Sequence, residues 1–168
     1  MSDKELEKFT EGKKEATEEL EETKGKKPKY AIRESVSDLV KRVNEVLYKG
    51  EPGNVSVDTY TKYTGYKPQF IIDAMNAVFG IGGWGFRDVS MELVEDGEAR
   101  LMVANEEVWI AGIDFRPTAY GQSRVTRGDI GDAKKGAQTD AIKKALSYFS
   151  IGNRAYHGLL KGSNQSVS

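Results

Sequence analysis

A chain of 168 residues with 38% hydrophobic side chains, 30% charged side chains and a formal net charge of −1 fits one water-soluble domain. It has no cysteine and a single histidine, His157, which excludes a disulfide framework, a thiolate metal site and a two-histidine zinc site. No apolar run approaches the roughly 20 residues of a membrane span and no apolar signal segment opens the chain, so we expect a cytoplasmic protein with no membrane partner.

The charge is unevenly distributed. Residues 1–29 hold 9 acidic and 8 basic side chains and few large apolar ones, which predicts a charged, flexible N-terminal tail. Residues 86–114 carry a net charge of −6, whereas residues 124–161 carry a net charge of +5. We expect a folded domain over 30–161 and a polar C-terminal tail over 162–168.

The first predicted elements are helical. Apolar residues recur at helical spacing over 33–48, and glycine, proline and asparagine at 50–54 end that helix. Residues 55–66 are rich in Thr, Tyr and Val and suit a short strand or an extended segment. Pro68 can open a second helix, and Gly80 stands where a left-handed helical cap is expected.

The stretch GIGGWGF, residues 80–86, matches the G-x-G-x-x-G fingerprint of dinucleotide-binding proteins. That fingerprint requires a strand before the glycines and a helix after them. Here a predicted helix comes first and a predicted strand follows, so we reject dinucleotide binding. The glycines instead turn the chain from helix to sheet, with Trp84 anchoring the corner.

A β-hairpin follows, with strands over 84–95 and 99–115 and a turn at Asp96-Gly97. A third strand is expected over 118–125, a long helix over 129–149 and a short final element over 152–158. This order predicts an α+β fold, in which an antiparallel three-stranded sheet packs against a long helix and other helices precede it.

The long helix is basic. Its apolar face is predicted to contain Ala141, Ile142, Ala145, Leu146 and Phe149. Lys143 and Lys144 flank that face and reach solvent. Lys134 and Lys135 project to the core side of a straight helix, so either the helix starts later or its first turns extend beyond the core. Both cases leave a basic helix end free for an anion.

Nucleic-acid phosphate is the anion that this pattern favours. Arg124, Arg127 and Arg154 add positive charge, and Tyr148 and Tyr156 lie nearby in sequence. Basic side chains mixed with aromatic rings suit single-stranded nucleic acid, whose bases expose their faces. The alternative is that the lysines merely solvate an exposed helix face.

Catalysis has weaker support. Asp129, Asp132 and Asp140 do not share one helix face, and no second carboxylate cluster joins them. We expect no enzymatic activity, no metal and no cofactor.

Two stretches together resemble the Rad52/DdrA superfamily of single-strand annealing proteins. YTGYKPQFIIDAMNAVFGIGGWGF, residues 63–86, resembles its helix followed by an FGxxGW motif. DAKKGAQTDAIKKALSYFSIGN, residues 132–153, resembles its basic helix, and SIGNRAYHG at 150–158 is most similar to the DdrA branch. The resemblance covers about residues 33–160.

This resemblance implies a β-β-β-α core, assembly into rings or open helical oligomers, and single-stranded DNA held in a groove. It also implies annealing without nucleotide hydrolysis, in recombination and double-strand break repair, in a nucleoid-associated or viral setting and with other recombination proteins as further partners. Lys143 and Lys144 match the family's paired basic residues, and Lys134 and Lys135 match basic positions at the start of the same helix.

Two positions depart from the family pattern. Ser147 and Gln69 stand where relatives often carry basic residues, and Lys67 or Arg87 would compensate. We include Lys67 and Gln69 with the candidate DNA-binding residues.

Two other classes remain open. A double-stranded RNA-binding module with α-β-β-β-α order would read A-form shape and 2′-hydroxyl groups. A small hydrolase or nucleotide-binding enzyme would need a convergent pocket, which the sequence does not reveal.

Overall fold

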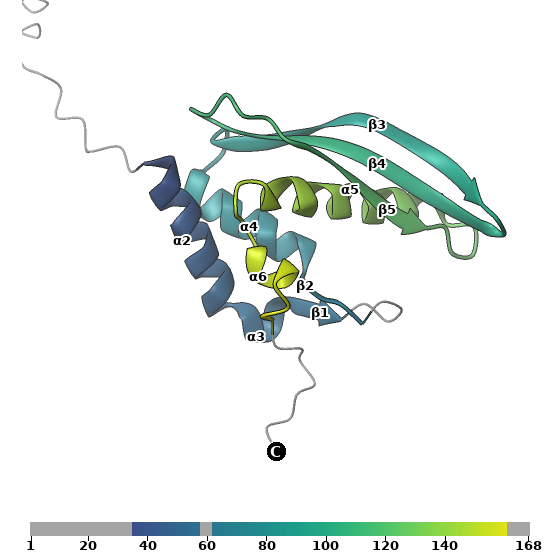
Figure 1. The fold of residues 1–168 in the computed structure, drawn as a ribbon, viewed down its shortest axis with the longest axis horizontal. Helices are drawn as coiled ribbons and strands as arrows, with labels where there is room; N and C mark the ends of the chain where they lie inside the picture. The colour runs from purple at the N-terminus through teal and green to yellow at the C-terminus, as the bar shows by residue number, and fades with distance from the viewer. Residues whose placement is uncertain (1–34, 58–61, 161–168) are drawn as a thin grey trace, which may run out of the picture. The chain divides into compact units, whose positions relative to one another are not determined.

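The computed structural model describes residues 35–57 and 62–160 (Figure 1). The predicted tails at 1–29 and 162–168 lie outside these residues. In chain order the elements are α2 (Val36–Lys49), α3 (Glu51–Asn54), β1 (Val55–Val57), β2 (Thr64–Tyr66), α4 (Pro68–Phe79), β3 (Trp84–Asp96), β4 (Ala99–Ile110), β5 (Thr118–Arg124), α5 (Ile130–Ser147) and α6 (Asn153–Tyr156).

The predicted α+β fold is confirmed. Strands β3, β4 and β5 form an antiparallel sheet in that order, and the helices lie on one side of it (Figure 1). Alternate residues of β4 point toward α5, and the buried ones are Met102, Ala104, Glu106, Val108 and Ile110. Because β4 is the central strand, it carries most of the sheet's contribution to the core.

Small residues let α5 approach the sheet closely. Ala133, Ala137 and Ala141 follow one another at four-residue intervals and are all buried. Opposite them lies Gly121 of β5, where a Cβ atom would overlap the backbone of Ala137 and Ala141. This alanine stripe, not the lysines, forms the sheet-facing side of the first turns.

The expectation that Lys134 and Lys135 project to the core side is therefore wrong. Both are exposed, and the helix begins at Ile130, close to the predicted start, with Asp129 as its N-cap. Ala133 and Ala137 turn the first half of α5 toward the sheet and leave the two lysines in solvent.

The turn between α4 and β3 confirms the predicted order, since the helix precedes the glycines and a strand follows them. Trp84 is 8% exposed, and its Nε1 donates a 2.8 Å hydrogen bond to Asn76 Oδ1 on α4, so this ring does anchor the corner. Gly80 has φ 73° and ψ 176°. Its φ is positive as expected, but the left-handed helical cap is wrong because its ψ is extended.

The segment 55–66 is a hairpin rather than one strand. Strands β1 and β2 pair antiparallel with Val55 opposite Tyr66 and Val57 opposite Thr64. Only the Val55–Tyr66 end of the pair is buried in the described residues, so the hairpin projects from the body of the domain (Figure 1).

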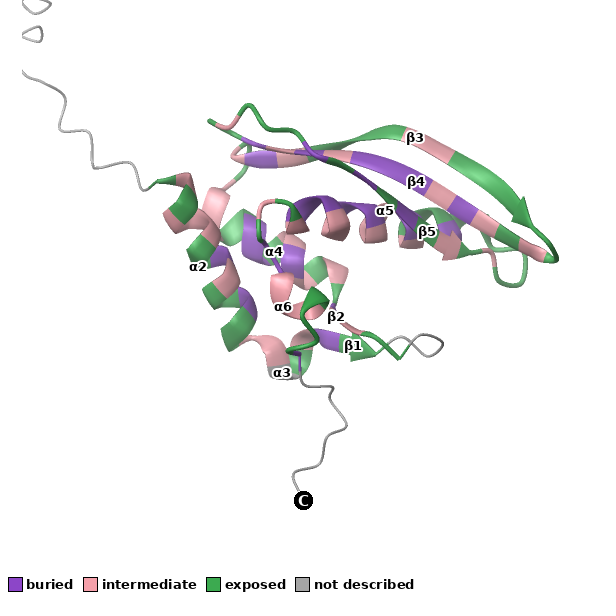
Figure 2. Cartoon of the chain, viewed as in Figure 1, coloured by how far each residue is buried: buried purple, intermediate pink, exposed green. Residues whose placement is uncertain are grey.

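The core has two parts, and Figure 2 shows its buried positions along α4, α5 and β4. The larger cluster joins α2, α4 and the C-terminal half of α5 to the sheet, with Leu47, Met75 and Leu146 fully buried. The smaller cluster contains Met102, Ala104, Ala133, Ala137 and Ala141, at the far end of the sheet. Most of β3 beyond Trp84 and Gly85 is exposed, so the half of the domain that contains the smaller cluster buries few residues.

Candidate nucleic-acid interface

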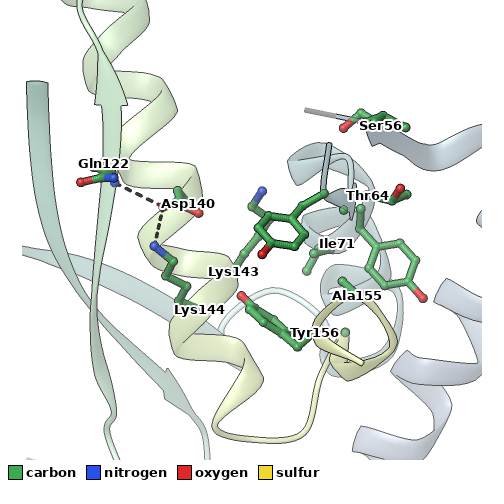
Figure 3. Close-up of a pocket in the computed structure, with 14 residues that line it drawn as sticks. Ser56, Thr64, Ile71, Gln122, Asp140, Lys143, Lys144, Ala155 and Tyr156 are labelled. Carbon is green, nitrogen blue, oxygen red and sulfur yellow. Dashed lines mark hydrogen bonds and ion pairs between the residues drawn. The ribbon is translucent and has the colours of Figure 1, made fainter. Parts of the chain in front are cut away.

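A groove of about 1010 Å³ runs between the β1–β2 hairpin and α5 (Figure 3). Its walls also include the free edge of β5 and the short helix α6. The lining residues are Ser56, Val57, Tyr63, Thr64, Gly65, Tyr66, Ile71, Gln122, Asp140, Lys143, Lys144, Gly152, Ala155 and Tyr156. The groove thus brings together segments that lie about one hundred residues apart in the chain.

The α5 wall carries the charged side chains. Lys143 and Lys144 both line the groove, which confirms that these neighbours project from the flank of the packed helix face. Lys144 Nζ lies 2.8 Å from Asp140 Oδ2, one helical turn earlier. Lys143 has no carboxylate within ion-pair distance in the described ranges 35–57 and 62–160.

Asp140 also contacts the sheet. Its Oδ2 accepts a 3.2 Å hydrogen bond from the backbone N–H of Gln122 (Figure 3). Strand β5 lies at the edge of the sheet, where outward-pointing N–H groups lack a partner strand. The carboxylate therefore satisfies an edge N–H group and a lysine at once.

The opposite wall is aromatic and apolar. Tyr63 is 78% exposed and Tyr156 is 55% exposed, and Ile71 of α4 and Ala155 of α6 add apolar lining. Tyr156 reaches from α6 toward α5 (Figure 3). Burial, together with the charge of Asp140, raises the pKa of the Tyr156 hydroxyl to about 12, so the ring stays neutral at physiological pH.

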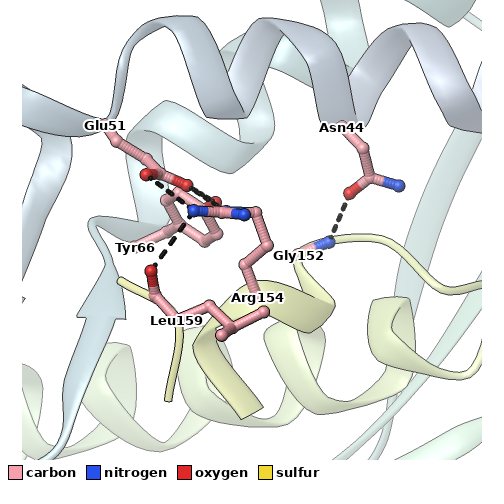
Figure 4. Close-up of polar contacts among 6 residues, drawn as sticks. All are labelled: Asn44, Glu51, Tyr66, Gly152, Arg154 and Leu159. Carbon is pink, nitrogen blue, oxygen red and sulfur yellow. Dashed lines mark hydrogen bonds and ion pairs between the residues drawn. The ribbon is translucent and has the colours of Figure 1, made fainter. Parts of the chain in front are cut away.

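A polar network holds this wall in place (Figure 4). Arg154 Nε lies 2.7 Å from Glu51 Oε1, and the same oxygen accepts a 2.8 Å hydrogen bond from the Tyr66 hydroxyl.

Arg154 also donates to the carbonyl of Leu159 at 3.2 Å and stacks over the Tyr48 ring. Asn44 accepts the N–H of Gly152 at 3.0 Å. The network joins α2, α3, β2 and α6.

The predicted binding residues therefore separate by environment. Lys143 and Lys144 lie in the groove. Arg154 lies beneath one of its walls, with its guanidinium directed to Glu51. DNA contact by Arg154 stays a prediction, and the contacts seen favour a supporting role.

Four other predicted residues cluster at the opposite end of α5. Lys134 and Lys135 occupy its first turns, about 12 Å along the helix axis from Lys143. Arg124 ends β5, and Arg127 lies in the turn that follows, at φ 53°. These four basic side chains are exposed on a part of the domain that does not line the groove.

Lys67 and Gln69 lie outside the groove lining, at the start of α4. Lys67 Nζ donates to the carbonyl of Gly53 at 2.9 Å, and Gln69 Nε2 donates to Asp73 Oδ1 at 2.8 Å. Arg87 makes two hydrogen bonds to the Glu107 carboxylate on the sheet, at 2.8 and 3.1 Å. The guanidinium of Arg87 is thus engaged by a carboxylate, and its compensating role stays a prediction.

Sequence reasoning missed two features of the site, namely Asp140 and the hairpin wall. The four-residue spacing of Asp140 and Lys144 on a helix was a usable signal for an ion pair. The hairpin wall had no comparable signal, because the position of the hairpin opposite α5 depends on contacts between segments far apart in the sequence.

Comparison with known proteins identifies the chain's relatives. A family model described as "Rad52/22 family double-strand break repair protein" matches residues 35–166. No curated protein matches the chain in sequence. In the described ranges, no helix has the length and apolar character needed to cross a bilayer. The family match spans most of the chain and implies a role in double-strand break repair and recombination, and the chain belongs to the Rad52/22 family.

Proposed function

We propose that this domain binds single-stranded DNA in the groove and anneals complementary strands without nucleotide hydrolysis. The observation that carries the proposal is the pairing of two unlike walls across one groove. Lys143 and Lys144 line one side, and the rings of Tyr63 and Tyr156 line the other.

The two walls match the two sides of a single strand. Phosphates bind lysine side chains and release counterions when they do so. Unpaired bases expose flat faces that stack on aromatic rings, at about 1–3 kcal/mol per base. Paired bases inside a duplex are not available for such stacking, so this combination favours a single strand over a double helix.

A longer path for the strand follows α5. Lys135, Thr139 and Lys143 succeed one another at four-residue steps, which places them along one side of the helix. We propose that the strand leaves the groove past Thr139 and meets Lys135 and Lys134. Arg124 and Arg127 add positive charge at that end.

Assembly strengthens such a weak site. In an array of subunits, each further contact with the same strand is effectively intramolecular. We propose a homo-oligomeric ring or open helix, in which the acidic segment 86–114 of one subunit faces the basic segment 124–161 of the next. The long edge strand β3 offers a joining surface.

Binding and annealing by the full chain test this proposal. We expect a labelled single-stranded oligonucleotide to bind more tightly than duplex RNA or duplex DNA of equal length. We expect annealing of complementary strands to proceed equally with and without ATP. Preference for duplex RNA would instead support an A-form reader, and strict dependence on ATP would contradict the annealing mechanism.

A matched pair of variants locates the site. Lys143→Ala should weaken binding about fivefold at 0.1 M salt, the contribution expected of one phosphate contact relative to 1 M salt. Lys41→Ala removes a lysine from α2, whose side chain is 71% exposed and outside the groove lining, and should leave binding unchanged. Equal losses in the two variants would show that net charge, not the groove, governs binding.

A further inference from the structure

We infer that Asp140 competes with the DNA phosphate for Lys144, so that the groove presents one lysine ready for binding and holds the second in reserve. The inference rests on the proposed function of this groove. It concerns how tightly the groove binds the DNA strand and how readily it releases the strand.

The ion pair lies inside the groove. Asp140 and Lys144 both line it, and their side chains are 30% and 43% exposed, respectively. Figure 3 shows Lys144 turned toward Asp140 and Gln122 of β5, on the side of α5 away from Ile71. A phosphate that enters the groove therefore meets a lysine already bonded to a carboxylate.

Asp140 is the less mobile partner. It lies in the middle of α5, and its Oδ2 is held by the N–H group of Gln122 as well as by Lys144. Lys144 has a flexible four-carbon stem and three N–H donors. When a phosphate arrives, the lysine can turn to it while the carboxylate stays near the edge of β5.

Few charged side chains line the groove, so the charge of Asp140 strongly affects how the groove attracts a phosphate. The described side chains that line the groove and carry a formal charge are Asp140, Lys143 and Lys144, which gives a net charge of +1. Replacing Asp140 by a neutral residue doubles this value. Arg154, which lies beneath the wall, forms an ion pair with Glu51, so this pair adds no net charge to the groove.

Weak, adjustable binding suits strand annealing. A strand must be held long enough to be displayed, and it must then leave with its complement. A carboxylate that recaptures Lys144 when the phosphate departs lowers the affinity of each subunit without removing the lysine.

The experiment measures binding of a labelled oligothymidine to the full chain across a range of salt concentrations. Asp140→Asn keeps an oxygen that can accept the Gln122 N–H group but removes the charge. Asp73→Asn is the matched control, because Asp73 is an exposed carboxylate on α4 bonded to Gln69 and lies outside the groove lining. Melting temperatures confirm that each variant is folded.

We expect Asp140→Asn to bind about two- to fivefold more tightly, the range for releasing a partly exposed ion pair. The slope of log affinity against log salt should steepen by about 0.7, because one more phosphate contact forms. Both changes should vanish when Lys144→Ala is also present. Asp73→Asn should change neither quantity.

Unchanged or weaker binding by folded Asp140→Asn would overturn the inference and show that the carboxylate has no effect or orients Lys144 for the phosphate. An equal gain in Asp73→Asn would also overturn it. If Asp140→Asn does not fold, the single variants Lys143→Ala and Lys144→Ala test the inference instead. Lys144→Ala must then cost less affinity than Lys143→Ala, and an equal or greater cost contradicts a reserve role.

A failure of the competition by Asp140 can be distinguished from a failure of the proposed function. If the parent does not bind single-stranded DNA, or if Lys143→Ala has no effect, the proposed function fails. If the parent binds and Lys143→Ala weakens binding, but Asp140→Asn gives no gain, only the competition by Asp140 is refuted.

Discussion

Helix α5 carries two pairs of adjacent lysines that look alike in sequence and differ in surroundings. Lys143 and Lys144 face a wall built by the β1–β2 hairpin and α6. Lys134 and Lys135 are exposed on the first turns of the helix, where no lining residue of the groove lies. The comparison teaches that a basic pair becomes a candidate site through the surface opposite it, not through its charge alone.

The two halves of the domain that bear these pairs also differ in depth of packing. The half with Lys143 and Lys144 rests on the larger cluster, where α2 and α4 cover α5 and the sheet. The half with Lys134 and Lys135 rests on the alanine stripe and a few residues of the sheet. We expect the first half to dominate stability and the strongest DNA contacts.

The largest expected effect is on stability. Trp84→Ala, in the larger cluster, should lower the free energy of unfolding by about 3–5 kcal/mol. Leu93→Ala, on the far half of β3 where the side chain is 41% exposed, should cost less than about 1 kcal/mol. Chemical denaturation measures both. A stable Trp84→Ala protein that has lost DNA binding would contradict the corner role and make Trp84 a stacking residue.

The second effect concerns the wall opposite Lys143. Tyr156→Ala should weaken single-stranded DNA binding by about 1–3 kcal/mol, the range for one stacked base. Tyr156→Phe keeps the ring and should bind like the parent. Oligonucleotide titrations of the two variants test this wall, and equal losses in both would show that the hydroxyl group, not the ring, is what matters.

The third effect concerns Glu106, which lies on β4 between Ala104 of the smaller cluster and Val108 of the larger one. The side chain is fully buried, and neither carboxylate oxygen has a hydrogen-bond partner in the described part of the chain. Burial, and then the neighbouring Asp88, raise the pKa of Glu106 from 4.5 to about 7.

A carboxyl group whose pKa is raised on folding stabilises the folded state in its protonated form. Its contribution is complete below about pH 4.5 and is lost as the pH rises through about 7. Glu106→Gln should therefore be more stable than the parent by roughly 1–3 kcal/mol above about pH 8, with the difference disappearing in acid. Denaturation at several pH values measures this, with Glu92→Gln on exposed β3 as the control. A parent and variant with parallel pH profiles would contradict the raised pKa.

Much of the fold could be predicted from the sequence because its signals are local. The four-residue apolar spacing in α2 and α5, proline at the start of α4, and the Asp96-Gly97 turn each act over a few residues. The order of helix, glycines and strand followed from these elements, and it is the reverse of the order that the dinucleotide fingerprint requires.

The groove was only half predictable, because its second half depends on contacts between distant segments. Lys143 and Lys144 were identified from the spacing on α5, and both line the groove. The hairpin that faces them was predicted as a short strand or an extended segment, since pairing of Val55 with Tyr66 leaves no periodic signal. The orientation of Lys134 and Lys135 was predicted wrongly because the alanines beside them, rather than larger apolar residues, form the packed face.

The central claim is that the basic side chains in the groove, and not basic charge in general, bind the DNA phosphates. Its most direct test compares the salt dependence of single-stranded DNA binding for Lys143→Ala/Lys144→Ala and Lys134→Ala/Lys135→Ala, two variants with the same loss of charge. Each substitution should change stability by no more than about 0.5 kcal/mol. We predict that the groove variant binds and anneals less well and that its slope of log affinity against log salt flattens by about 0.7 for each lost phosphate contact, with a smaller change in the other variant. If the groove variant binds and anneals like the parent at the same slope, or if the Lys134→Ala/Lys135→Ala variant loses more, the DNA site lies elsewhere on the domain.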